Sequence, residues 1–238
     1  MTNTATVWPG AVALLWEQQQ LMLLPERALW VPEQRVLLLA DLHLGKAETF
    51  QANGIPLPSD GDHTNLNRLL ALSHGLQPQR VLVLGDLIHN RIGLTAALRQ
   101  MLSQLPQLLN CPLQLVAGNH DAGCWLEGLP AEPSQCCGPL WLSHAPEQPP
   151  KPGLLNVCGH LHPVAVLGGS ADRLRLPCFA LDRRQRQLQL PAFGNLTGGY
   201  PCDAALERWV IADDQVLALQ GLPELQSQQM QKRPAGSP

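Results

Sequence analysis

The sequence lacks any apolar run of the roughly 18 to 20 residues needed to cross a bilayer. It also lacks the charged and then apolar opening that is typical of a secretory signal. Charged residues make up only 15% of the chain and the formal net charge is -3, so no overall positive charge indicates a nucleic-acid or membrane partner. We therefore expect a soluble cytoplasmic protein that recognises any such partner through local features.

The seven cysteines lack the CxxC spacing that is typical of zinc sites and of redox pairs. Their odd number and irregular spacing do not suggest a disulfide framework. We interpret even the adjacent Cys136 and Cys137 as ordinary thiols, which fits a reduced compartment.

Hydrophobic residues, at 45% of the 238 residues, are sufficient for a sizeable core. We predict a single catalytic domain over residues 1–215. Residues 216–238 are polar and rich in helix and strand breakers, and we expect a largely disordered C-terminal tail there.

The pattern of apolar residues predicts a mixed α/β fold. Weak alternation over residues 11–31 indicates an antiparallel hairpin, and apolar residues at helical spacing predict helices over 61–74 and 95–109. Pro106 is expected to kink or shorten the second helix. From Leu140 onward the segments are short and bounded by turns, as in an antiparallel second sheet.

Five short apolar runs end abruptly in polar side chains that can bind metal ions. Such runs are typical of strands buried on both faces of a sheet. In open α/β sheets, ligands bind beyond the carboxyl ends of the strands, so the five ends should converge. The polar residues at these ends are Asp41 and His43, Asp86, Asn119 and His120, His144, and His160 and His162.

The residue types at these ends suit a pair of divalent cations. Asp41 and His43 are two apart on a segment expected to be extended, so both side chains should project to the same side. His160 and His162 repeat this spacing, and the two oxygens of Asp86 can bridge two ions. Imidazole, carboxylate and amide ligands without thiolate favour Mn, with Zn or Fe as alternatives.

Two such ions, about 3.5 to 4 Å apart, can hold a bridging hydroxide and stabilise the attacking and leaving oxygens of a phosphate ester. The pattern therefore indicates hydrolysis of a phosphate ester. The alternative is a purely structural role, in which each His or Asp only satisfies hydrogen bonds at a strand end. That reading is reasonable for one residue and poor for five ordered motifs.

The motifs resemble, in order, those of the calcineurin-like metallophosphoesterases: DLH at 41–43, GD at 85–86, GNHD at 118–121, His144, and GHLH at 159–162. The resemblance implies a four-layer sandwich of two mixed sheets flanked by helices, with a dimetal site at the carboxyl ends of the strands. It implies one metal held by Asp41, His43, Asp86 and His162, and a second held by Asp86, Asn119, His144 and His160. It also implies that His120 is a general acid oriented by Asp121.

A finer resemblance is to the bacterial DNA ligase-associated phosphodiesterases and endonucleases. Its segments include 28–50, 54–58, 85–89, 158–163, 176–181 and 190–199. The resemblance implies a DNA substrate and a functional association with an ATP-dependent DNA ligase and a helicase. The chain departs from the pattern at Gln51 and Ala122, where the resemblance predicts arginine. Two positively charged side chains are therefore missing near the place where the substrate phosphates are expected to bind.

Four further residues are candidates for substrate binding. Lys46 follows the first motif and can reach a phosphate, although an exposed lysine is the ordinary alternative. His89 follows Asp86 closely and can line the site. Arg183 and Arg184 belong to a run from Asp172 to Arg186 with a local excess of positive charge, which suggests a nucleic-acid rim or simply a solvated face.

Three functions remain open at this point. The first is a metal-dependent phosphodiesterase or endonuclease that acts on DNA during repair. The second is a phosphatase for a small nucleotide or a phosphoprotein, which a pocket closed by a lid would favour. The third is a non-catalytic scaffold on the same fold, although such scaffolds typically lose the acid or a ligand, and both are present here.

Overall fold

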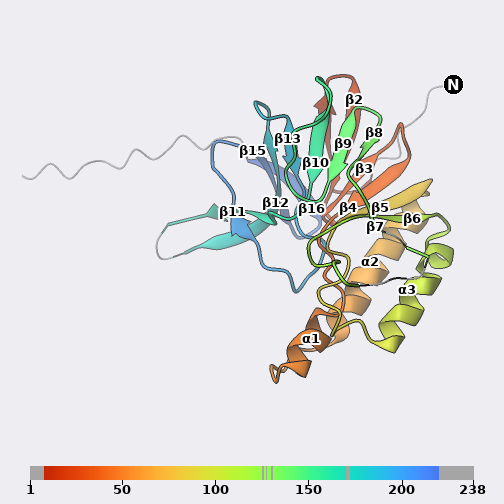
Figure 1. Cartoon of the computed structure of the whole chain (residues 1–238). Helices are drawn as coiled ribbons and strands as arrows, with labels where there is room; N and C mark the ends of the chain where they lie inside the picture. The colour runs from red at the N-terminus through yellow and green to blue at the C-terminus, as the bar shows by residue number, and fades with distance from the viewer. Residues whose placement is uncertain (1–7, 125, 127, 130, 170–171, 220–238) are drawn as a thin grey trace, which may run out of the picture.

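The computed structural model describes residues 8–124, 126, 128–129, 131–169 and 172–219. Within them, two β-sheets pack face to face and the helices lie together on one side (Figure 1). The first sheet is built from the first half of the chain and the second sheet from the second half. The prediction of an α/β fold with two mixed sheets is confirmed.

The first sheet has seven strands in the described part of the chain, and they occur in sequence order. The first four pair antiparallel, so that the segment predicted as a hairpin, 11–31, holds three strands and β4 follows it, and the last four pair parallel. The strands are β1 (Val12–Trp16), β2 (Gln19–Leu24), β3 (Ala28–Val31), β4 (Val36–Leu39), β5 (Arg80–Leu84), β6 (Leu113–Val116) and β7 (Ala131–Glu132).

The second sheet has nine strands within the described residues and is also mixed. Its strands are β8 (Gln135–Cys137), β9 (Leu140–Ser143), β10 (Leu155–Cys158), β11 (Pro163–Leu167), β12 (Leu174–Asp182), β13 (Gln187–Gln189), β14 (Tyr200–Pro201), β15 (Glu207–Ala212) and β16 (Gln215–Leu219). Strands β9 and β13 run parallel to β10, whereas β12 runs antiparallel to β11, β13 and β15. The expected antiparallel sheet is therefore mixed instead.

Both predicted long helices are present, as α2 (Asp60–Leu76) and α3 (Ala96–Leu109), and a short helix α1 (Lys46–Ala52) precedes them. The side chain of Thr95 caps α3 by accepting a hydrogen bond from the Leu98 N–H at 3.2 Å. The expected shortening at Pro106 is wrong, since α3 continues to Leu109. Leu105 and Leu109 are buried on either side of the proline, and their packing offsets the lost backbone hydrogen bond.

Two apolar cores hold the layers together. One lies between the first sheet and the helices, where Leu69 and Leu105 pack in the same cluster as Val83. The other lies between the sheets and includes Leu38 and Phe179, both fully buried. Since β4 and β5 contribute to both cores, they are buried on both faces, as their continuous apolar runs predicted.

The predicted domain boundary after residue 215 falls inside β16. Val216 is buried and pairs with Ile211 on β15, so residues 216–219 belong to the second sheet. The remainder of the predicted tail, 220–238, lies outside the described residues. None of the helices in the described part of the chain is both long enough and apolar enough to cross a membrane.

The core between the sheets makes a prediction about stability. Leu38→Ala should lower the free energy of unfolding by about 2–5 kcal/mol, because a fully buried side chain is replaced by a cavity. Leu15, on β1, is 63% exposed, and Leu15→Ala should change stability by less than about 0.5 kcal/mol. Urea denaturation of the two variants measures the difference, and equal midpoints would contradict this description of the core.

Candidate metal centre

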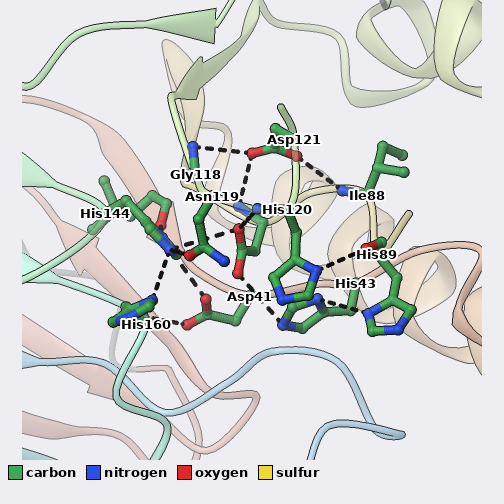
Figure 2. Close-up of polar contacts among 12 residues, drawn as sticks. Asp41, His43, Ile88, His89, Gly118, Asn119, His120, Asp121, His144 and His160 are labelled. Carbon is green, nitrogen blue, oxygen red and sulfur yellow. Dashed lines mark hydrogen bonds and ion pairs between the residues drawn. The ribbon is translucent and has the colours of Figure 1, made fainter. Parts of the chain in front are cut away.

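The candidate metal ligands lie close together, and Figure 2 shows Asp41, His43, Asn119, His144 and His160 among them, beside His120. They follow the carboxyl ends of the parallel strands β4, β5 and β6 in the first sheet and of β9 and β10 in the second. Hydrogen bonds join the two sheets here, including one from the Phe193 N–H to the Ala40 carbonyl at 2.8 Å. The centre therefore lies at the seam of the sandwich.

The backbone at the centre is left-handed, which corrects the prediction that Asp41 and His43 lie on an extended segment. The φ angles of these two residues are 57° and 49°, and the φ of Asp86 is 53°. His160 and His162 are also left-handed, with φ angles of 65° and 44°. Non-glycine residues rarely adopt this conformation, and each instance costs of order 1–3 kcal/mol, so such strain concentrates at functional sites.

Backbone hydrogen bonds from the neighbouring loop hold the first of these turns. The Asp41 N–H donates to the Gly85 carbonyl at 3.1 Å, and the His43 N–H donates to the Asp86 carbonyl at 2.9 Å. The loops after β4 and β5 therefore fix each other, and they bring both candidate motifs to the same point.

The carboxylate of Asp41 joins both sheets and leaves one oxygen without a donor. Its Oδ2 accepts a hydrogen bond from the His160 N–H at 2.9 Å. Its Oδ1 lies 3.3 Å from Nε2 of His162, yet both atoms are buried without a hydrogen-bond partner. Ligand atoms of Asp41, His43 and His162 lie within 4.8 Å of one another, so these three residues can hold a cation.

His144 faces a second group of ligand atoms. Its Nδ1 lies 2.9 Å from the Leu84 carbonyl, so Nδ1 carries the proton and donates it there. This tautomer leaves Nε2 as an acceptor, 2.9 Å from Oδ1 of Asn119 and 3.1 Å from Nδ1 of His160. Nε2 of His144 and Oδ1 of Asn119 are then two acceptors that face each other and repel. A cation between them would relieve this repulsion.

Asp86 lies between the two groups. Its Oδ2 is 3.7 Å from Nε2 of His43, and its Oδ1 is 3.6 Å from Nε2 of His144. The side chain is 2% exposed, and Oδ1 also accepts a hydrogen bond from the His120 N–H at 2.9 Å. One carboxylate can therefore contribute an oxygen to each of two cations, as its sequence position suggested.

Burial keeps two of the imidazoles in the neutral form that binds metals. It lowers the pKa of His43 to about 2, with smaller contributions from the neighbouring His120 and His162. Burial, with smaller contributions from the nearby Lys46 ammonium and His120, also lowers the pKa of His89 to about 4. At neutral pH both rings therefore offer a lone pair to a cation or to a donor.

The general-acid candidate, His120, is oriented differently from what we expected. Its Nδ1 lies 2.8 Å from the His89 carbonyl and donates there, so a backbone oxygen orients the ring. The Asp121 carboxylate instead accepts hydrogen bonds from the backbone N–H groups of Asp86 at 2.8 Å, Ile88 at 3.1 Å and Gly118 at 3.2 Å. Asp121 therefore shapes the loops after β5 and β6 and does not contact the His120 ring.

His89 and Lys46 lie beside the centre, where the sequence placed them. Nδ1 of His89 is 3.4 Å from Nδ1 of His43, and its ring stacks on His120 at 5.1 Å between ring centroids and on Phe50 at 6.0 Å. Ligand atoms of His43, His89 and His120 also lie within 4.8 Å of one another. Lys46 begins α1, and burial lowers its pKa.

Arg183 and Arg184 lie at the opposite end of the second sheet, which corrects their assignment to the substrate site. Their turn connects β12 to β13, and Gln187 at the start of β13 pairs with Asn156 near the start of β10, whereas His160 follows the end of β10. Arg183 forms a salt bridge with Glu207. Arg184 lines a different cavity of 830 Å³, which contains none of the candidate metal ligands.

A pocket of 390 Å³ opens at the centre. His160 is exposed at its wall, so the mouth is open to solvent on that side. Tyr200 lines the pocket as well, although no motif in the sequence predicted a functional residue at that position. The lining residues are Asp86, Asn119, His120, His160, Leu161, His162 and Tyr200.

Close packing around Gly159 leads to a prediction. A Cβ at this position would lie 2.5 Å from Cβ of Ala40 and 2.6 Å from Oδ2 of Asp41, so Gly159→Ala should displace the Asp41 carboxylate. We expect Mn²⁺ binding, measured by calorimetry, to weaken at least 10-fold, on the scale of losses seen when the support of a metal ligand is removed. Gly169→Ala is the matched control, since nothing lies within 4 Å of a Cβ there. Unchanged affinity in Gly159→Ala would contradict the assigned packing.

The chain is similar to a known protein family and to solved structures. The family model for the calcineurin-like phosphoesterases matches residues 34–212, a span that contains every candidate ligand. The crystal structure of the Pseudomonas putida nuclease MPE matches with a TM-score of 0.72 and 29% identity, covering 88% of this chain and 100% of that chain. Yfce, a phosphoesterase from E. coli, matches with a TM-score of 0.43 and 18% identity over 77% of this chain and 96% of its own. No curated protein matches the chain.

Proposed function

The chain belongs to the calcineurin-like phosphoesterase family and is a metal-dependent phosphoric ester hydrolase, and we propose that it is a nuclease that cleaves phosphodiester bonds in DNA. The observation that carries the proposal is the pair of ligand groups that share Asp86 at an open pocket. Support for nucleic acid as the substrate comes from the similarity to the Pseudomonas putida nuclease.

The proposed ligand sets follow the two groups of side chains. Asp41, His43, Asp86 and His162 hold one cation, and Asp86, Asn119, His144 and His160 hold the other. The paired acceptors and the buried unpartnered atoms of Asp41 and His162 fit such cations. When bound, two divalent ions supply an activated water and neutralise charge on the phosphodiester. The nitrogen and oxygen donors favour Mn²⁺ over softer metals.

His120 is proposed to protonate the leaving oxygen or to stabilise charge on the phosphate. Its ring lines the pocket, and donation from Nδ1 to the His89 carbonyl leaves Nε2 available for the substrate. Asp121 supports this role indirectly by holding the loops that carry Asp86 and His120.

Lys46 and His89 are proposed to contact the phosphate, since both lie beside His43 at the edge of the centre. The open mouth suits a polymer that extends beyond the pocket better than a small enclosed substrate. A role in DNA repair, with an ATP-dependent ligase and a helicase as functional partners, is part of the proposal and rests on the motifs of the ligase-associated group.

The first test is hydrolysis of bis-p-nitrophenyl phosphate beside p-nitrophenyl phosphate, with Mn²⁺, Zn²⁺ or Mg²⁺ added to the metal-free protein. We expect diester cleavage that requires Mn²⁺, and cleavage of a DNA oligonucleotide under the same conditions. Asp86→Ala should abolish both activities because the shared carboxylate is lost, whereas Asp60→Ala, on the exposed start of α2, should retain them.

Other outcomes would change the proposal. Cleavage of the monoester alone would indicate a phosphatase for small substrates. Absence of hydrolysis with Mn²⁺ demonstrably bound would favour a non-catalytic scaffold. Wild-type turnover in Asp86→Ala would overturn the shared-ligand arrangement.

The role of His120 makes a separate prediction. His120→Ala should reduce kcat by roughly 10²- to 10⁴-fold for diesters with a poor leaving group, because general-acid catalysis contributes on that scale. The loss should be much smaller for a nitrophenyl leaving group, which departs without a proton. His63→Ala, at an exposed position on α2, is the control. An equal loss on both substrates would instead assign His120 to charge stabilisation.

A further inference from the structure

The mouth of the pocket carries a side chain that the hydrolytic chemistry does not use. Tyr200 is the single tyrosine of the chain, and it is 71% exposed. It nevertheless lines the same pocket as Asp86, His120 and His162. Within the part of the chain that the structure describes, it belongs to none of the hydrophobic clusters. The packing of the fold therefore does not explain a large aromatic ring at this position.

The backbone beneath Tyr200 is firmly held. Its N–H donates to the His162 carbonyl at 3.0 Å, and the Cys202 N–H donates to the Val164 carbonyl at 3.1 Å. These bonds join β14 to β11, with Tyr200 paired to Pro163. At Gly199 a Cβ would lie 2.2 Å from Cγ1 of Val164, so the chain is packed tightly against the strand. The ring is therefore exposed, while the backbone that carries it is held beside the proposed ligand His162.

A guanidinium contacts the backbone directly before Tyr200. Arg175 donates from Nη2 to the Gly199 carbonyl at 2.6 Å, and the residue is exposed. It lies near the start of β12, on the hairpin with β11 that projects from the second sheet (Figure 1). Strand β11 begins directly after His162, so the base of this hairpin is at the metal centre. Arg175 pairs with Val166 toward the tip of this hairpin, and its side chain contacts the Gly199 carbonyl next to Tyr200, so it brings positive charge to the side of the mouth where Arg183 and Arg184 do not.

An exposed ring and a guanidinium beside a phosphoesterase centre match the two parts of a nucleotide. Aromatic rings stack on nucleobases with little dependence on sequence, and arginine binds phosphate through its planar set of donors. We propose that Tyr200 and Arg175 form a nucleotide subsite, in which Tyr200 stacks on the base next to the scissile phosphate and Arg175 contacts the adjoining phosphate. This proposal rests on the proposed nuclease function. It identifies a nucleotide of the substrate as the group that binds at the mouth of the pocket.

The test compares variants at Tyr200 on two DNA oligonucleotides that differ by two bases. One oligonucleotide is intact, and the other has abasic sugars on both sides of the mapped cleavage position. On the intact strand, Tyr200→Ala should raise KM by about 5- to 150-fold, the range of one base-stacking contact, with kcat little changed. Tyr200→Phe keeps the ring and should behave like the wild type. On the abasic strand, Tyr200→Ala and the wild type should have equal KM.

The controls separate this subsite from the nuclease function itself. Leu15→Ala removes a comparably exposed apolar side chain on β1 and should leave both parameters unchanged. If Tyr200→Ala raises KM equally on intact and abasic strands, or not at all, stacking is overturned while the nuclease function stands. If the wild type cleaves bis-p-nitrophenyl phosphate but neither oligonucleotide, the nuclease function fails and the subsite fails with it.

Arg175 has its own readout, the salt dependence of KM on the intact strand. Loss of one phosphate contact should reduce the slope of log KM against log salt concentration by about one in Arg175→Gln. Arg184→Gln, at the far end of the sheet, is the matched control and should keep the wild-type slope. Equal slopes for all three proteins would remove Arg175 from the subsite.

Discussion

The buried carboxylate of Asp41 is the interaction on which the rest of the centre depends. It follows a strand of the first sheet, accepts the His160 N–H from the second sheet, and presents its other oxygen to His162. A carboxylate with 0% exposure is costly unless it is paired, so its position constrains every group around it. The glycine at 159 is part of the same constraint, because only a residue without Cβ lets the two sheets approach so closely.

Bound cations would compensate for both the backbone strain at the centre and the repulsion between its acceptor atoms. Left-handed turns at Asp41, Asp86 and His160 bring carboxylate and imidazole lone pairs together, although each turn is unfavourable by itself. Cations that bind only the folded arrangement stabilise it by mass action, so the energy stored in the turns is offset by metal binding. The fold therefore positions the ligand atoms before metal binds, and the metal-free protein is less stable as a result.

The sequence was sufficient to place the centre, because each ligand follows an apolar run and parallel strands end at the same edge. It could not predict the backbone at Asp41 and His43, since two-residue spacing fits an extended strand and a left-handed turn equally well. It also misassigned the arginines, because strand register decides that Arg175 lies on the side of the pocket and Arg183 on the far side. Tyr200 reaches the pocket only through the pairing of β14 with β11, which no local pattern reveals.

The division of the ligands between the two halves of the chain has a consequence for biosynthesis. The strands of the first sheet end at residue 132, and the described strands of the second begin at residue 135. A chain growing from the ribosome thus acquires Asp41, Asp86 and Asn119 well before His144 and His160 are made. The nascent polypeptide then holds both carboxylates but lacks the imidazoles of the second sheet, so its capacity for hydrolysis arises only after the second sheet has been made.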